Sequence, residues 1–191
     1  MKDQKTIDLF LYWNRLRDGR PAPRRNEIEP ADIRSLLGDT FILEEDARGQ
    51  AVFRLAGTRL CALFGKELKG FVFSSLWSDR DRRIVNRLAG NAFRDNCVVA
   101  LSLEGHSRAG RMIAMELVLL PIQGTQTMPN SAIRLLCSIA AAAALAAPRC
   151  ARPTQTKLAA ATADPAVASR EAFDDVVQKT YGRYPVTIVR G

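Results

Sequence analysis

The side chains that most often carry out catalysis are scarce in this chain. Its single histidine, His106, lies in the stretch EGHSRAG between two apolar segments, a pattern that predicts a turn. A histidine can act as a general base or bind haem iron, but a histidine in a turn is far more often a polar surface residue. A nucleophilic triad needs a serine or cysteine and a carboxylate held beside the imidazole, and nothing in this turn indicates them. We therefore predict no catalytic residue.

The cysteines do not indicate a metal site. They stand singly, at Cys61, Cys97, Cys137 and Cys150, without a CxxC pair, whereas zinc needs clustered thiolates or imidazoles. The first three lie in apolar segments and are predicted to be small buried side chains. The glycines of residues 57–70 bracket a helix and lack the GK[ST] ending of a phosphate loop. We predict neither a metal nor a cofactor.

Arginine gives the chain its excess of positive charge. The formal net charge is +8, from 28 Lys and Arg against 20 Asp and Glu. Such a balance is compatible with nucleic acid, an acidic protein or a membrane surface as a partner. Most charges alternate in sign as on a solvated face, including those of residues 79–95, so the net charge alone does not select a partner.

One arginine cluster stands out near the N-terminus, where prolines hold the chain extended. One interpretation is a docking patch for phosphate or an acidic protein. The other, which we favour, is a structural clamp in which the guanidinium groups bind backbone carbonyls and the nearby Glu27, Glu29 and Asp32. The five arginines of this cluster, within eleven residues, are Arg15, Arg17, Arg20, Arg24 and Arg25.

The first predicted element is an amphipathic helix over residues 6–18. Its large apolar side chains include Phe10, Leu11, Tyr12 and Trp13, which have to be buried somewhere. Two arrangements would bury them. The helix can pack on a second copy of the chain as a dimer helix, or it can cover the sheet of its own domain.

A hairpin and two short helices are predicted next. A short helix over residues 29–38 precedes strands at 40–44 and 51–55. Gly57 then breaks the second strand, and Thr58 is predicted to cap a one-turn helix.

The second half of the chain continues the sheet. Ser78 is predicted to cap a longer helix. Residues 97–103 and 112–120 form a long antiparallel hairpin, and residues 131–139 form a last central strand, which gives five strands in all. From residue 140 onward, alanine and threonine dominate, which predicts a low-complexity segment that is mobile or marginally helical.

The phrase FRLAGTRLCALFGKELKG, together with the aromatic leading helix and the Arg-Pro-x-Arg segment, resembles a PAS domain. It resembles in particular an alphaproteobacterial PAS-like family of poorly defined function, over roughly residues 8–140. The resemblance implies an α+β fold, with a PAS-like five-stranded antiparallel sheet, helices on one face, and the amphipathic N-terminal helix in front. The implied divisions are an N-terminal helical and Arg/Pro segment (1–38), the PAS-like domain (39–140), an Ala/Thr-rich low-complexity segment where the resemblance fails (141–168), and a C-terminal helix and tail (169–191).

The resemblance also implies a cavity between sheet and helices that can hold a small ligand. The same apolar side chains can instead form a filled core, because a cavity requires missing volume that a sequence does not reveal. The candidates to line the cavity are Phe53, Leu55, Leu60, Phe64, Phe73, Trp77, Leu88, Val99, Met115, Leu117 and Leu135.

These observations predict a cytoplasmic sensory or regulatory module without catalytic output, since no signal peptide and no catalytic set is found. The longest apolar run, residues 135–147, is shorter than the ~20 residues of a spanning helix, so no membrane insertion is expected. Such a module acts through a homodimer or a signalling protein partner and can bind a small molecule. The alternative is a basic nucleic-acid- or ribosome-associated protein whose arginine clusters contact phosphates.

Overall fold

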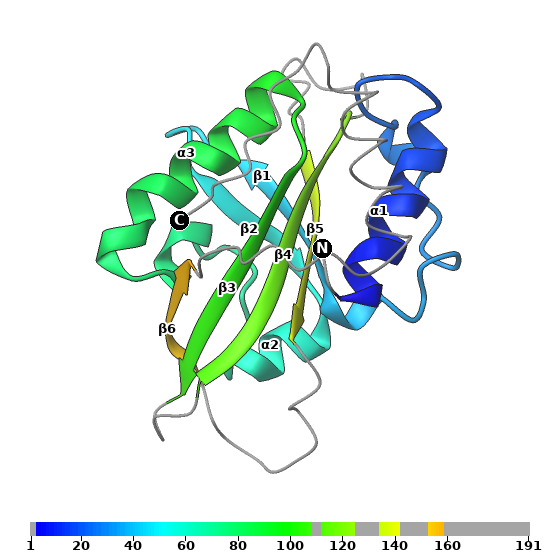
Figure 1. Ribbon diagram of the computed structural model, residues 1–191. Coiled ribbons are helices and arrows are strands. Elements are labelled where there is room, and N and C mark those ends of the chain that lie inside the picture. The colour runs from blue at the N-terminus through cyan, green and yellow to red at the C-terminus, as the bar shows by residue number, and fades with distance from the viewer. Residues whose placement is uncertain (1–2, 108–111, 125–133, 142–152, 159–191) are drawn as a thin grey trace, which may run out of the picture.

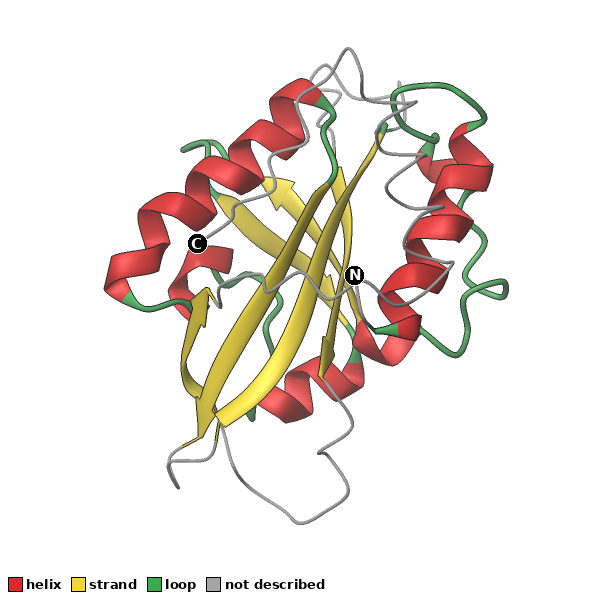
Figure 2. Ribbon diagram, viewed as in Figure 1, coloured by secondary structure: helices red, strands yellow, loops and turns green. Residues whose placement is uncertain are grey.

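The structure of the protein is a computed structural model that describes residues 3–107, 112–124, 134–141 and 153–158 (Figure 1). A single sheet runs through the middle, with helices on both sides (Figure 2). In chain order the elements are α1 (Gln4–Arg17), η1 (Arg25–Glu27), η2 (Leu37–Asp39), β1 (Thr40–Glu45), β2 (Ala51–Ala56), α2 (Thr58–Phe64), η3 (Phe73–Leu76), α3 (Asp79–Asp95), β3 (Val99–Ser107), β4 (Met112–Ile122), β5 (Arg134–Ala141) and β6 (Pro153–Leu158), where η marks a short 3-10 helix.

The sheet has the strand order β2-β1-β5-β4-β3-β6, and each neighbouring pair is antiparallel. The first five are the strands predicted from the sequence, so the α+β fold with a five-stranded antiparallel sheet is confirmed. The predicted long hairpin is β3–β4, which pairs Val99 with Leu119 at one end and His106 with Met112 at the other. Because the ladder extends this far, His106 belongs to β3, and the prediction that it lies in a turn was wrong.

A sixth strand, which the sequence did not predict, extends the sheet beyond β3. β6 pairs antiparallel with β3 and lies within the segment 141–168 that was predicted to be of low complexity. Its sequence PTQTKL has threonine at alternate positions, and this β-branched residue favours extended backbone. Because the residues around it are rich in alanine, this short strand pattern was not recognised in the sequence. The predicted C-terminal helix and tail, residues 169–191, lie outside the described residues.

The face of the sheet covered by α2, η3 and α3 is called the core face. Alternation along β1 turns Phe41 and Leu43 toward it, and α3 adds an apolar stripe that includes Leu88. Three phenyl rings meet at its centre, with centroids 5.2 Å apart for Phe41–Phe53, 5.9 Å for Phe41–Phe73 and 5.7 Å for Phe53–Phe73. Aromatic side chains of this size dominate the energetics of a core of this kind.

Helix α1 covers the opposite face of the sheet, called the α1 face (Figure 1). Phe10 and Trp13 are 1% and 0% exposed and pack with Val118 and Leu120 of β4. The indole Nε1–H of Trp13 donates a hydrogen bond of 2.7 Å to the carbonyl oxygen of Pro121. Because both faces of the sheet are covered, β4 carries the near-continuous apolar run LVLLPI instead of an alternating pattern.

Two predictions around α2 were wrong in detail. Residues 30–36 form a series of turns that ends in η2 instead of a helix. Gly57, not Thr58, is the N-cap of α2. The backbone at Gly57 passes so close to η2 that a Cβ atom would lie 2.3 Å from the carbonyl oxygen of Leu37, so only glycine fits there.

Candidate functional site

Ten of the eleven residues predicted to line a cavity belong to one buried cluster on the core face. The exception is Leu55, which is 55% exposed, and its prediction as a lining residue was wrong. A β-bulge pairs Leu55 with Ile42 but Phe53 with Leu43, so the alternation along β2 is lost at this point. The ten buried residues are Phe53, Leu60, Phe64, Phe73, Trp77, Leu88, Val99, Met115, Leu117 and Leu135.

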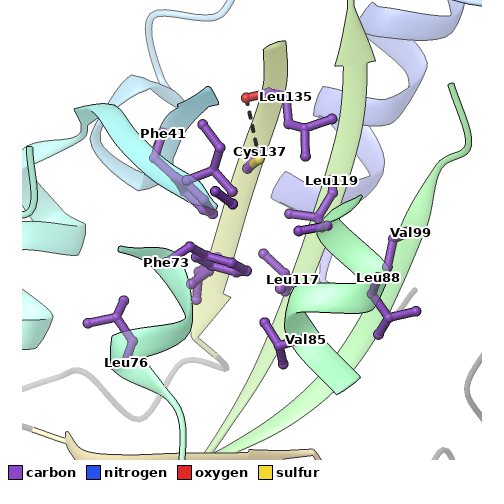
Figure 3. Packing of buried hydrophobic residues seen from close by; sticks show 14 of the residues in the cluster. Phe41, Phe73, Leu76, Val85, Leu88, Val99, Leu117, Leu119, Leu135 and Cys137 are labelled. Carbon is purple, nitrogen blue, oxygen red and sulfur yellow. Dashed lines mark hydrogen bonds between the residues drawn. The ribbon is translucent and has the colours of Figure 1, made fainter. Parts of the chain in front are cut away.

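The cavity prediction left out other members of the same cluster, although Cys137 was predicted to be buried. Phe41, Leu43, Leu68 and Cys137 are all 0% exposed. Figure 3 shows Phe41 and Cys137 among the side chains that face one another between the strands, η3 and α3. The alternation of apolar residues along the first strand carried the signal for Phe41 and Leu43. Leu68 gave none, because it lies in a segment whose other residues are polar.

Trp77 is the one residue of the core-face cluster whose side chain carries a nitrogen donor, the indole Nε1–H. Trp77 is 3% exposed, and its ring stands edge-on to Phe73 with centroids 5.8 Å apart. Its Nε1–H has no hydrogen-bond partner among the described residues. A buried donor without an acceptor costs about 1–3 kcal/mol, which makes it an unusual feature of a core and one that needs an explanation.

The cysteines have no features of a nucleophile. Burial raises the pKa of the Cys97 thiol, to which the charge of Asp95 adds, and raises that of Cys137 well above its ordinary value. Both thiols are therefore neutral near pH 7. Cys61 was also predicted to be buried but is only half-buried, with Sγ 3.6 Å from a carboxylate oxygen of Glu67. Cys150 lies outside the described residues.

The described part of the chain offers neither a cluster of metal ligands nor a membrane-spanning helix. No three histidine, cysteine, aspartate or glutamate side chains among these residues are grouped so that they could hold a metal ion. None of the helices described is both long enough and apolar enough to cross a membrane.

Two arginines of the N-terminal cluster form a structural clamp. The Arg17 side chain is 4% exposed, lies over the Trp13 ring at 5.2 Å, and donates to the carbonyl oxygen of Arg20 at 3.0 Å. The Arg20 guanidinium binds both carboxylate oxygens of Glu27, at 2.9 and 2.8 Å, and holds the pKa of Glu27 below its ordinary value. Both groups are used within the chain, which agrees with the favoured interpretation.

The other three arginines of the cluster face solvent. Arg15 lies over the Tyr12 ring at 5.5 Å and makes a long contact of 3.9 Å with Asp32. Arg24 and Arg25 are exposed, and their backbone pairs with Gln123 next to β4. The structure therefore brings together Arg17 and Arg20 as parts of the fold, and leaves Arg15, Arg24 and Arg25 available at the surface.

The predicted dimer helix is used mainly within its own chain. Phe10, Tyr12 and Trp13 are buried against the sheet and the turns that follow α1, which is the second of the two predicted arrangements and leaves these three side chains no surface for a dimer contact. The Tyr12 hydroxyl accepts a hydrogen bond of 2.8 Å from the backbone N–H of Glu29. Leu11 alone of the four projects outward, at 49% exposure. Covering the sheet with this helix satisfies the burial that the sequence demands.

The carboxylate of Asp39 joins the helices of the two faces. It accepts a hydrogen bond of 2.8 Å from Lys5 Nζ of α1 and one of 2.9 Å from Arg59 Nε of α2. Burial acts to raise the pKa of Asp39, but the bonds from Arg59 and Lys5 outweigh it and hold the pKa below its ordinary value. Arg59 also donates to the carbonyl oxygen of Ser35 at 2.8 Å. The Asp39 side chain therefore connects α2 to α1, so that a displacement of α2 changes the contacts of α1.

A family model described as PAS domain matches residues 1–137 of the chain. The chain belongs to the PAS domain family. This match extends over α1 and the Arg/Pro segment as well as the sheet. A search of curated proteins found no match. PAS domains are generally sensory or regulatory modules, and that is the function that the family supports here.

Proposed function

We propose that this PAS domain is a sensory module without catalytic output that binds a small ligand on its core face and acts through a second copy of the chain or a signalling protein. The observation that carries the proposal is the Nε1–H of Trp77, which is buried among apolar side chains and has no acceptor among the described residues. An indole N–H donates only, so a ligand atom that satisfies it has to be an acceptor such as a carbonyl or ether oxygen.

The packing around Trp77 limits the size of such a ligand. The Phe73 ring lies 5.8 Å from the Trp77 ring and also contacts Phe41 and Phe53, at 5.9 and 5.7 Å. Close-packed rings leave little free volume. The ligand is therefore a small, mostly apolar molecule with one acceptor, and its entry moves at least one of these rings.

Movement of the core face has a physical path to the surface. Leu60 and Phe64 of α2 belong to the core-face cluster, while Arg59 of the same helix binds Asp39. Asp39 in turn holds Lys5 of α1, the helix that presents Leu11 to solvent. A ligand that displaces α2 thus changes the position of α1, and the outer side of α1 is the surface on which we place the protein contact.

Native mass spectrometry of the full chain purified from the producing cells tests the ligand. We expect a defined extra mass on the wild-type protein. Trp77→Phe keeps an aromatic ring, although a smaller one, and removes the donor, which should weaken ligand binding about tenfold. The matched control is Trp13→Phe, because Trp13 is the other tryptophan of the chain and lies on the opposite face. Loss of the extra mass in both variants, or in neither, would contradict a role for the Trp77 N–H.

Analytical ultracentrifugation tests the protein contact separately. The wild-type chain is expected to dimerise or to bind a partner, and Leu11→Ser is expected to weaken that association without changing the ligand mass. Leu55→Ser is the matched control, because Leu55 is similarly exposed on β2. A strictly monomeric chain for which affinity capture yields no partner would remove the proposal, whether or not a ligand is found.

A further inference from the structure

The outer side of α3 carries a straight line of arginines. Arg80, Arg83, Arg87 and Arg94 are all exposed. Their spacing of three, four and seven residues places them within an arc of about 60° on the helix, over a length of about 21 Å, because each residue turns by 100° and rises by 1.5 Å. We call these four residues the α3 arginine stripe. By the same helical geometry it lies opposite the apolar side of α3, which packs on the core face.

The acidic residues of α3 are not paired with the stripe. Asp81 is buried and accepts a hydrogen bond of 2.7 Å from the Ser78 hydroxyl. Asp79 lies one turn before Arg83, but its carboxylate is paired with Arg82 at 2.7 Å. Asp95 is exposed and lies about 60° outside the arc of the stripe. Within the part of the chain that the structure describes, no carboxylate pairs with an arginine of the stripe. Arg94 lies over the bare backbone of Gly90 and donates to Asn91 at 3.2 Å, so it too keeps its charge unneutralised.

The chemistry around the stripe restricts its partner. The apolar residues of α3 are buried against the sheet, so the helix has no apolar side to insert into a bilayer. No large apolar side chain is exposed on α3, whereas a stable protein interface is built around a buried apolar centre. The helix also lacks an exposed aromatic ring on which the bases of a single strand could stack. A partner that binds through charge alone, by the release of counterions, fits these features.

We propose that the α3 arginine stripe binds the phosphate backbone of double-stranded nucleic acid without reading its sequence. This inference is independent of a ligand on the core face, since the stripe points away from it. Phosphates of a duplex form a continuous line of negative charge, and guanidinium groups are the side chains best suited to bind them. The stripe is about 21 Å long, which is about two-thirds of one turn of the duplex, because a turn is about 34 Å long.

The number of arginines sets a quantitative expectation. Four neutralised phosphates give a slope of about −3.6 in a plot of log affinity against log salt concentration for a duplex. The affinity should therefore fall about 150-fold between 50 and 200 mM salt. Each single Arg→Gln substitution in the stripe should make the slope less negative by about 0.9.

Fluorescence anisotropy with the full chain and a labelled 20-bp DNA duplex of mixed sequence tests the proposal. R80Q/R83Q/R87Q/R94Q is expected to lose duplex binding at 50 mM salt. R24Q/R25Q/R34Q/R48Q makes the same change in net charge at exposed positions elsewhere and is expected to bind within threefold of the wild-type protein. The single variants, measured with circular dichroism as a check of folding, keep the test valid if a quadruple variant misfolds.

Several outcomes would overturn the proposal. The first is that the wild-type chain does not bind the duplex at 50 mM salt. The second is that the two quadruple variants lose the same amount of duplex affinity. The third is that the slope of log affinity against log salt concentration is the same in the single variants as in the wild-type protein. Stronger binding to a 20-nucleotide single strand would also reject a duplex. Binding only to vesicles with 30% phosphatidylserine, or only to polyglutamate, would assign the stripe to a membrane or an acidic protein. A second duplex of unrelated sequence should bind with the same affinity, and a difference above tenfold would reject backbone recognition.

Discussion

The two faces of the sheet each bury one tryptophan, and the two indoles are treated differently. On the α1 face, Trp13 donates to the carbonyl oxygen of Pro121 at 2.7 Å, and the Arg17 guanidinium lies over its ring. On the core face, Trp77 is surrounded by apolar side chains and finds no acceptor among the described residues. Both tryptophans are buried, so burial does not distinguish the two faces. They differ in whether the indole Nε1–H has a hydrogen-bond acceptor among the described residues.

This contrast concerns the indoles and not every polar group. The hydroxyls of Thr6 and Ser138 are also buried without a partner among the described residues, and Thr6 belongs to α1. Both ends of α1 are nevertheless held by hydrogen bonds. At its first turn Lys5 binds Asp39, and the backbone N–H of Asp3 donates to Glu116 at 3.1 Å. The contrast therefore rests on the two indoles, of which one has its acceptor among the described residues and the other does not.

The largest expected effect is on the core face. Phe73→Ala removes the ring that contacts Phe41, Phe53 and Trp77, and should lower the free energy of unfolding by about 4 kcal/mol. Leu55→Ala, at a position that the sequence assigned to the same cluster but the structure exposes, should change it by less than about 0.5 kcal/mol. Urea denaturation measures both. A cost above 2 kcal/mol for Leu55→Ala would mean that β2 is packed differently.

An intermediate effect separates the two tryptophans. Trp13→Phe leaves the carbonyl oxygen of Pro121 buried without its donor and should cost about 2 kcal/mol beyond the smaller ring. Trp77→Phe removes a donor that has no partner, so in ligand-free protein it should cost at least about 1 kcal/mol less than Trp13→Phe. The measurement is again the midpoint and slope of urea unfolding. Equal costs for the two substitutions would abolish the contrast between the faces.

The smallest effect concerns Asp39, the side chain that links the faces. Its pKa is lower in the folded chain than in the unfolded chain, so the carboxylate adds stability at pH values above the unfolded pKa of about 4, and this contribution is lost as the pH falls through the folded pKa. Asp39→Asn should therefore cost about 1 kcal/mol at pH 7 and nothing near pH 2. Thermal unfolding of both proteins between pH 2 and 7 measures the difference. A gap that stays constant down to pH 2 would show that charge is not involved.

The sequence predicted the fold well because its main signals are local. Alternating or continuous apolar runs located five strands, and the spacing along residues 79–95 located α3 and its buried side. Ten cavity candidates were found in one cluster because periodicity identifies buried positions. It failed for Leu55, since a bulge depends on the pairing of two strands and leaves no mark in the sequence of one.

The features that suggest function were less accessible to sequence reasoning. That Trp77 lacks an acceptor and Trp13 has one depends on which backbone carbonyl is within reach, and this is a property of the assembled chain. The choice between clamp and patch for Arg17 and Arg20 likewise required knowing where Glu27 and the end of α1 lie. The α3 arginine stripe could have been found from its spacing. The alternation of charges along the helix concealed that Asp79 is paired with Arg82 and that Asp81 is buried, so neither pairs with the stripe.

The margins of the sheet limit how this protein can associate. Along the outer side of β2, the backbone N–H of Phe53 donates to the carbonyl oxygen of Phe71 at 3.0 Å, and Gly70 N–H donates to Phe53 at 2.8 Å. At the other margin β6 occupies the free side of β3, and β6 itself has only six residues. Among the described residues, the backbone that a strand of another molecule could extend is thus limited to the short outer side of β6 and to the part of β2 not paired with Phe71 and Gly70, and short or covered edges of this kind protect a sheet against fibril-like aggregation. Association of this protein should proceed through the outer sides of its helices.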